Sequence, residues 1–225
     1  IDQNNYRWVR TYYSSIADAT GKIVKVLGRT QDIDDDKRER QRMAELIETD
    51  STTGLLNKLA ITNHIQALIH EKAVASSFFA MLDIDDFKTF NDTYGHLVGD
   101  KVLIEIAKVL QVSVRSEDCV ARFGGEEFSI ILNQCTSNSI FTVAERIRKN
   151  IEKISLFEKG EELKITVSIG GCLIEAINFL TPKYIVKKAD QALYESKHNG
   201  RNRSTILKMG LLDLASLKKD LKDNP

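Results

Sequence analysis

The chain has 225 residues, of which 42% are hydrophobic and only two are proline, a composition typical of a protein that folds around an apolar core. Lys plus Arg and Asp plus Glu each number 32, so the net charge argues against nucleic-acid binding through a generally basic surface. Cys119, Cys135 and Cys172 are widely spaced in apolar segments, which predicts free thiols in a reducing cytoplasm rather than disulfides or a zinc site.

The sequence gives no indication of a membrane segment or a leader. No apolar run is long enough to span a bilayer, and the first ten residues do not resemble a signal peptide. We therefore expect a cytoplasmic location for this part of the protein. Because the chain does not begin with Met, we expect it to be a piece of a longer protein, in which any membrane segment would lie upstream.

Residues 1–49 are predicted to form a hairpin followed by a helix. Aromatic and β-branched residues occur on both sides of the turn DATGKI, which predicts strands over 6–16 and 22–32. Two strands alone are marginally stable, so we expect the end of a larger sheet domain. In the next segment Asp34 or Asp35 can cap a helix, and Met43, Leu46 and Ile47 give it a sparse apolar face. This helix either connects two domains and pairs with a second copy, or is a solvated linker.

From Asp50 onward, helical and strand patterns alternate. Helices are predicted over 59–70, 98–114, 137–154 and 181–199, and strands over 76–85, 120–123, 128–132, 163–174 and 204–207. This order predicts an α/β (α+β) fold with a mixed sheet covered by helices. Ser168, Gly170 and Gly171 indicate a close approach of another backbone. The tail 210–225 can form one more helix.

Two polar segments follow the first of these strands. In LDIDDFKTFND a buried strand delivers Asp83 and Asp85 to its carboxyl end, where a carboxylate is costly unless it is paired or binds a metal such as Mg²⁺. Asp83 is the better ligand candidate, and Asp85 can equally be a helix cap. In NDTYGHLVGD, Asn91 and Asp100 offer an amide and a carboxylate that match a guanine edge, although spacing alone favours two helix caps.

The segment RFGGEEF combines a flexible turn with two acids. Gly124 and Gly125 permit a tight turn and a close approach of the backbone to a polyphosphate. Glu126 and Glu127 are predicted to start the returning strand and to point to opposite faces, so that one can face a metal. The alternative is a simple Gly-Gly hairpin with solvated glutamates.

Two cations complete the set of candidate residues. In ALYESKHNGRN, Lys197 and Arg201 are four residues apart, which predicts that both lie on one face near a helix C-terminus. They can hold terminal phosphates or simply complement the helix dipole. Taken with the acids and the glycine turn they predict a nucleoside-triphosphate site, and the absence of GxxxxGK[ST] excludes a P-loop.

Residues 50–209 resemble the GGDEF family of diguanylate cyclases through DSTTGLLNK, DIDDFKTFND, YGHLVGD, RFGGEEF, SIG and ADQALYESKHNGRN, in family order. The resemblance implies a mostly antiparallel central sheet flanked by helices, similar to the palm of nucleotide cyclases and polymerases. It also implies condensation of two GTP into cyclic di-GMP and two pyrophosphates, by a homodimer with one GTP per domain. Residues 1–36 resemble the C-terminal fragment of a PAS sensor domain, which leaves 37–49 as a signalling linker helix.

The resemblance assigns roles residue by residue. Two Mg²⁺ (or Mn²⁺) would be bound by Asp83, the carbonyl of Ile84 and Glu126, with Glu126 also a proposed general base and Glu127 a supporting acid. The GTP contacts would come from Asn91 and Asp100 at guanine, His96 near the nucleoside, and Phe87, Lys88, Gly124, Gly125, Lys197 and Arg201 at the phosphates.

The segment RSED matches the family's RxxD product site and ends five residues before the glycines. Arg115 and Asp118 would then bind cyclic di-GMP and inhibit turnover, while the alternative is a surface ion pair. A different reading of the chain is a catalytically inactive sensor that binds GTP or cyclic di-GMP, but the retained signature acids and glycines favour the enzyme. Use of ATP is disfavoured because the carboxylate of Asp100 suits guanine and not adenine.

Overall fold

The computed structural model describes residues 7–70, 77–135, 137–174 and 181–208. Contacts within the chain divide it into two units, Ile1–Ile47 and Glu48–Pro225. No described helix is both long and apolar enough to cross a membrane. The helix expected in residues 210–225 lies outside the described residues.

The first unit contains a hairpin and most of a helix. Strands β1 (Val9–Ala17) and β2 (Ile23–Asp32) are antiparallel, every residue in them is exposed, and α1 (Asp34–Glu48) follows. The helix was expected to be capped by Asp34 or Asp35. Instead, Asp32 accepts a hydrogen bond from the backbone N–H of Asp34 at 3.0 Å, and Asp34 accepts one from the N–H of Trp8 at 3.2 Å. The side chain of Asp34 therefore ties the helix start to the hairpin.

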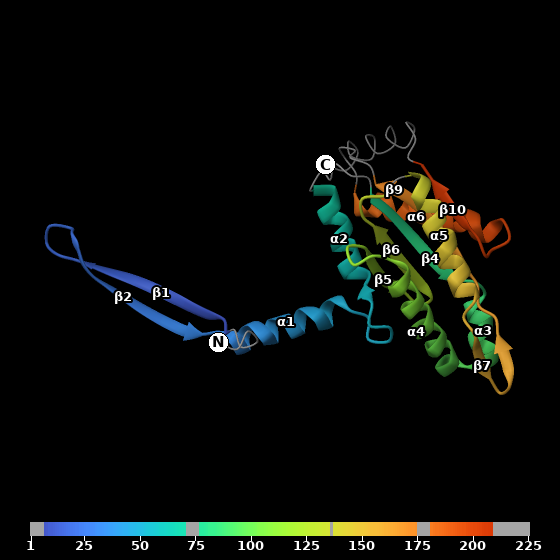
Figure 1. The fold of residues 1–225 in the computed structure, drawn as a ribbon, viewed down its shortest axis with the longest axis horizontal. Coiled ribbons are helices and arrows are strands. Elements are labelled where there is room, and N and C mark those ends of the chain that lie inside the picture. The colour runs from blue at the N-terminus through green and yellow to red at the C-terminus, as the bar shows by residue number, and fades with distance from the viewer. Residues whose placement is uncertain (1–6, 71–76, 136, 175–180, 209–225) are drawn as a thin grey trace. The chain divides into compact units, whose positions relative to one another are not determined.

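The second unit is built on a six-stranded sheet. Its strand order is β10 (Ser204–Leu207), β9 (Val167–Ile174), β4 (Ser77–Ile84), β6 (Glu127–Leu132), β5 (Cys119–Gly124) and β3 (Leu56–Asn57) (Figure 1). The three inner pairings are antiparallel, and the two outer pairings are parallel. The prediction of a mixed, mostly antiparallel sheet is confirmed.

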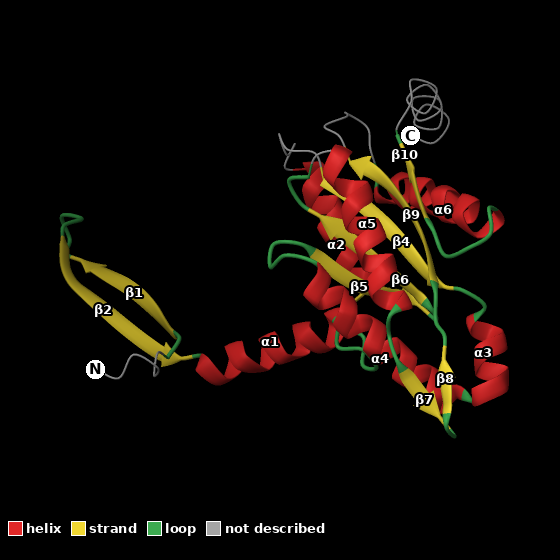
Figure 2. Ribbon diagram, turned by 45° about the vertical axis from the view of Figure 1, so that its right-hand side comes forward, coloured by secondary structure: helices red, strands yellow, loops and turns green. Residues whose placement is uncertain are grey.

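Helices cover both faces of this sheet (Figure 2). Because side chains alternate along a strand, Phe78 and Leu82 of β4 point to one face and Phe79 and Met81 to the other. The first face packs against α4 (His96–Ser113) and α5 (Ser137–Glu152), and the second against α2 (Lys58–His70) and α6 (Pro182–His198). The result is a three-layer arrangement with β4 at its centre.

Three boundaries differ from the sequence-based expectation. A separate helix α3 (Phe87–Tyr94) precedes α4, and Gly95, with φ +86°, ends one helix and begins the next. The N-cap position of α3 is occupied by Asp86, so Asp85 is not the helix cap that was considered. The strand expected over 163–174 is interrupted, because β7 (Leu156–Glu158) and β8 (Glu161–Leu163) form a small separate hairpin.

Glycines in β9 explain how α6 lies against the sheet. A Cβ built on Gly170 would be 1.9 Å from the backbone nitrogen of Leu193 in α6. On the opposite face, a Cβ on Gly171 would be 2.2 Å from the ring of Phe78. The close approach expected at this motif is confirmed, and it fixes the distance between α6 and the strand.

We expect Gly170→Ala to destabilise the fold by about 3 kcal/mol, because the added methyl group meets helix backbone that cannot rotate away. Urea denaturation measures the loss. Gly28→Ala is the control, since a Cβ there meets the ring of Tyr13 at an ordinary 3.5 Å. Equal stability of Gly170→Ala and the parent chain would contradict the packing described.

Candidate active site

Asp83 lies next to the carboxyl end of β4 and is only 6% exposed. Its Oδ2 atom is 2.8 Å from Nζ of Lys197 in α6. Burial raises the pKa of Asp83, Lys197 opposes this rise, and the charges of Glu126 and Asp85 add to it. The buried acid expected at the end of this strand is therefore present, and it is electrostatically crowded.

The turn between β5 and β6 brings two further acids to Asp83. Gly125 has φ +53°, a value that favours glycine, and Gly125 and Glu126 form the turn itself. The prediction that Glu126 starts the returning strand is therefore wrong. The alternative of a Gly-Gly turn is also wrong, because the two turn residues are Gly125 and Glu126. Glu127 begins β6 directly opposite Asp83, and burial, followed by the charge of Asp83, raises the pKa of Glu127.

Arg122 holds this turn in place, a role that the sequence analysis did not assign. Its Nε donates a hydrogen bond to the carbonyl oxygen of Gly125 at 2.9 Å, and its Nη1 lies 3.2 Å from Oδ1 of Asp50. Asp50 in turn accepts hydrogen bonds from the hydroxyl and the N–H of Thr53. The backbone N–H of Ile84 also donates to the carbonyl of Glu126 at 3.4 Å, so the turn is fastened to β4 as well.

These carboxylates suit a divalent cation with hard oxygen ligands. Mg²⁺ is usually bound by one or two carboxylates together with phosphate and water oxygens rather than by a cage of protein groups. Among the described residues no group of three or more His, Cys, Asp or Glu is arranged as a metal site by itself. Burial and, after it, the charges of Glu126 and Asp85 raise the pKa of Asp83, and added positive charge would favour its ionised form, so the residues present fit such an ion.

A second group of candidates lies where α3 meets α4. The side-chain Oδ1 atom of Asn91 is buried and has no hydrogen-bond partner within the described part of the chain. It packs on Gly99, where a Cβ would come within 2.0 Å of it. Asp100 follows on α4 and is exposed. Neither Asn91 nor Asp100 occupies an N-cap position, which overturns the two-cap reading that spacing alone favoured.

The remaining candidates surround these two groups. Phe87 begins α3 and is buried, Lys88 beside it is exposed, and His96 is the exposed first residue of α4. Lys197 lies in the last turn of α6, but the helix ends at His198, so Arg201 is not on the same helix face as predicted. Gly200, with φ +107°, turns the chain, and Nε of Arg201 lies 3.4 Å from Oδ1 of Asp86.

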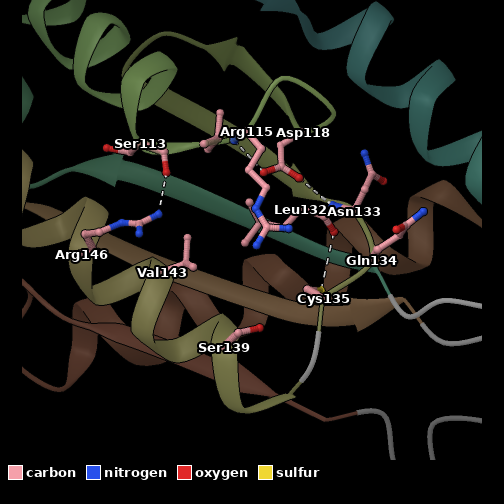
Figure 3. A pocket seen from close by; sticks show the side chains of 11 residues that line it. Ser113, Arg115, Asp118, Leu132, Asn133, Gln134, Cys135, Ser139, Val143 and Arg146 are labelled. Atoms are coloured by element: carbon pink, nitrogen blue, oxygen red, sulfur yellow. Dashed lines mark hydrogen bonds between the residues drawn. The ribbon is translucent and has the colours of Figure 1, made fainter.

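Arg115 and Asp118 border a separate pocket of about 140 Å³ on the α5 side of the sheet (Figure 3). They do not pair with each other as the surface ion-pair reading required. Asp118 accepts hydrogen bonds from the backbone N–H of Arg115 at 3.0 Å and of Asn133 at 2.8 Å. Figure 3 shows the guanidinium of Arg115 extending over the pocket.

The same pocket contains a second arginine that the sequence analysis missed. Arg146 of α5 lines the pocket, and its Nη2 donates to the carbonyl oxygen of Ser113 at 2.9 Å. It belongs to no motif, since only the packing of α5 beside the end of α4 brings it to Arg115. Cys135 also lines the pocket, and burial raises the pKa of its thiol.

Comparison with known proteins identifies close relatives of the second unit. The family model described as "Diguanylate cyclase, GGDEF domain" matches residues 47–203. Diguanylate cyclase A of Treponema denticola is 42% identical over 172 residues, which cover 72% of this chain and 46% of that protein. Probable diguanylate cyclase DgcT of Escherichia coli is 35% identical, over 70% of this chain and 35% of its own length. The chain spans less than half of either relative.

A solved structure has the same fold. The coiled coil and GGDEF domain of DgcB from Caulobacter crescentus, solved in complex with c-di-GMP, superposes with a TM-score of 0.72 at 29% identity. The match covers 78% of this chain and 93% of that one.

We expect Mg²⁺ to raise the thermal unfolding midpoint of the chain, because the ion would relieve the repulsion between the buried Asp83 and the half-buried glutamates beside it. Asp83→Asn should remove most of this rise, whereas Glu161→Gln, at an exposed position in β8, should keep it. Thermal scans with increasing MgCl₂ measure the effect. An equal rise in the parent and Asp83→Asn would place the ion elsewhere.

Proposed function

Because the chain belongs to the GGDEF family of diguanylate cyclases, we propose that it condenses two molecules of GTP into cyclic di-GMP and releases two pyrophosphates. The observation that carries this proposal is the gathering of Asp83, Glu126 and Glu127 where Lys197 and the glycine turn meet. Acids for a cation and a cation for phosphates, side by side, suit phosphoryl transfer.

The elbow of α3 and α4 supports recognition of guanine. The unpartnered Oδ1 atom of Asn91 can accept a hydrogen bond from a base, and Gly99 leaves room for that amide. A carboxylate at Asp100 can accept from both N1–H and the 2-amino group of guanine, a pair of donors that adenine lacks. His96, at the start of α4, would lie near the nucleoside. A buried acceptor left unpaired costs about 1–3 kcal/mol, so binding guanine would recover this energy.

The turn and the cations support binding of the triphosphate. The exposed Gly124 and Gly125 present backbone without side chains, while Lys197 and Arg201 would bind the β- and γ-phosphates. Phe87 and Lys88 would contribute phosphate contacts from the start of α3. Lys197 pairs with Asp83 and Arg201 with Asp86, so both cations are held at the site by acids.

The chemistry follows from this arrangement. The 3′-hydroxyl oxygen of one GTP attacks the α-phosphorus of the other, the bond to the bridging oxygen breaks, and pyrophosphate leaves. We assign Glu126 as the base that takes the hydroxyl proton and Glu127 as its supporting acid. Two Mg²⁺ or Mn²⁺ held by Asp83, the Ile84 carbonyl and Glu126 would supply Lewis-acid charge at the reacting oxygens. The protein's own part is to orient both nucleotides and to neutralise charge.

Two identical bonds must form, and each domain offers one nucleotide site. We therefore propose a homodimer in which two GTP-loaded domains face each other. The exposed Met43 and Ile47 of α1 support pairing through the linker helix, with both side chains more than half exposed. The preceding hairpin, proposed as the end of a PAS-like sensor, would act through this helix.

The pocket beside α5 supports a regulatory site. Arg115, Asp118 and Arg146 surround it, and two guanidinium groups near one another favour a ligand with phosphates. We propose that cyclic di-GMP binds there and inhibits its own synthesis.

Product identification tests the enzyme against the inactive sensor. The chain, verified as a dimer, should convert GTP with Mg²⁺ to cyclic di-GMP and should form no dinucleotide from ATP. Glu126→Gln should lower the rate by about 100-fold or more through loss of base and ligand, while Glu161→Gln should keep it. If the chain binds GTP but forms no dinucleotide, the enzyme hypothesis is rejected and the inactive sensor is the remaining hypothesis.

Arg115→Ala should weaken product inhibition by about tenfold or more, since a charge-assisted contact to phosphate would be lost. The initial rate at low product should stay unchanged, because Arg115 lies outside the nucleotide site. Initial rates measured against added cyclic di-GMP report both values. An unaltered inhibition constant would rule out this pocket as the product site.

A further inference from the structure

Backbone strain is concentrated next to the phosphate-binding cations. Asp86, Arg201 and Asn202 have φ values of +55°, +59° and +46°, in a region that residues with a side chain rarely adopt. Nε of Arg201 lies 3.4 Å from Oδ1 of Asp86, which joins two of these three residues directly. Such strain persists only where surrounding contacts determine the backbone.

Asp85 provides the first of these contacts. Its Oδ1 atom accepts a hydrogen bond from the hydroxyl of Ser168, and its Oδ2 accepts one from the hydroxyl of Thr166, both at 2.7 Å. Oδ2 also accepts from the backbone N–H of Asn202 at 3.0 Å. The carboxylate thus joins the ends of β4 and β9 to the loop that follows α6. Three donors satisfy it, in contrast to its crowded neighbour Asp83.

Asn202 is held equally well through its side chain. Nη1 of Arg148 donates to Oδ1 of Asn202 at 2.6 Å, and Nδ2 of Asn202 donates to Oε1 of Glu152 at 2.8 Å. Arg148 is only 8% exposed and also pairs with Glu145 and Glu152 at 3.0 Å. A buried guanidinium with this many partners has little freedom to move, so α5 gives the loop a rigid support.

We propose that Asp85, Asn202 and Arg148 form a positioning network that holds Arg201 at the terminal phosphates of the bound nucleotide. This inference rests on the proposed nucleotide site and adds residues that touch no nucleotide themselves. A guanidinium on a loop must lose conformational freedom when it binds phosphate, and the network removes that freedom beforehand. Asn202 suits its place because asparagine tolerates positive φ better than most residues and its amide reaches two partners.

The test uses the whole chain and the variant Asn202→Gly, which keeps the positive φ and deletes the amide contacts. Binding of 3′-deoxy-GTP, which lacks the attacking hydroxyl, and of GMP is measured with Mg²⁺ by isothermal titration calorimetry. We expect the affinity for 3′-deoxy-GTP to fall about tenfold, the value of one charge-assisted contact. The affinity for GMP, which lacks the terminal phosphates, should stay within about twofold. A general structural defect would weaken both.

A double-mutant cycle shows whether Asn202 acts through Arg201. Arg201→Ala should lose about as much affinity for 3′-deoxy-GTP as Asn202→Gly or more, and the double variant should be no weaker than Arg201→Ala alone. Lys149→Ala, an exposed neighbour of Arg148 on α5, is the control and should bind normally. Additive losses in the double variant would overturn the inference.

Asn202→Asp is a second variant. It keeps the tolerance of positive φ and the oxygen that accepts from Arg148, but it replaces the amide that donates to Glu152. We expect it to lose less affinity for 3′-deoxy-GTP than Asn202→Gly, again with little change for GMP. Equal losses for both nucleotides in both Asn202 variants would overturn the network, as would a parent chain that does not bind 3′-deoxy-GTP. Cyclic di-GMP formation by the parent is assayed in parallel. If the Asn202 variants lose affinity for 3′-deoxy-GTP alone and the parent chain makes no cyclic di-GMP, the positioning network is supported and the proposed reaction is rejected.

Discussion

Strand β4 is buried along all of its eight residues, and a strand with no exposed face needs a cover on both sides. The alternation of its side chains decides which helices provide that cover. Phe78 and Leu82 require α4 and α5, and Phe79 and Met81 require α2 and α6. Asp83 continues the second series, so it leaves the core toward α6, where Lys197 meets it. The position of Asp83 thus follows from the alternation of the β4 side chains between the two faces of the sheet.

Two acids leave this strand two residues apart and have opposite environments. Asp83 is buried beside one cation, Lys197, and two like charges, and burial is the main reason why its pKa is raised. Asp85 has two hydroxyl donors and a backbone N–H, so its charge is satisfied without a metal. The charge of Asp83 is under-compensated, which suits the metal-binding role proposed for it. Asp85 instead joins the ends of β4 and β9 to the loop that carries Arg201.

The layered fold and the principal acids could be predicted because they depend on local periodicity and on motifs that are continuous in sequence. The close approach at Gly170 and Gly171 of β9 could also be predicted from the sequence, because a close backbone contact leaves no room for a larger residue. The prediction that Arg201 shares a helix face with Lys197 was wrong, because that spacing assumes a continuing helix, whereas α6 ends at His198 and Gly200 turns the chain. Arg146 and Arg148 were missed because they act through tertiary packing of α5, for which no motif exists.

The ion pair of Arg122 with Asp50 has a mechanical consequence. Asp50 follows the end of α1 by two residues, its N–H donates to the carbonyl of Leu55, and Thr49 is bridged to Leu56. The side chain of Arg122 therefore links the segment around Asp50 to the turn at Gly125. A displacement of the backbone at Asp50 would therefore be passed through the side chain of Arg122 to the turn that carries Glu126.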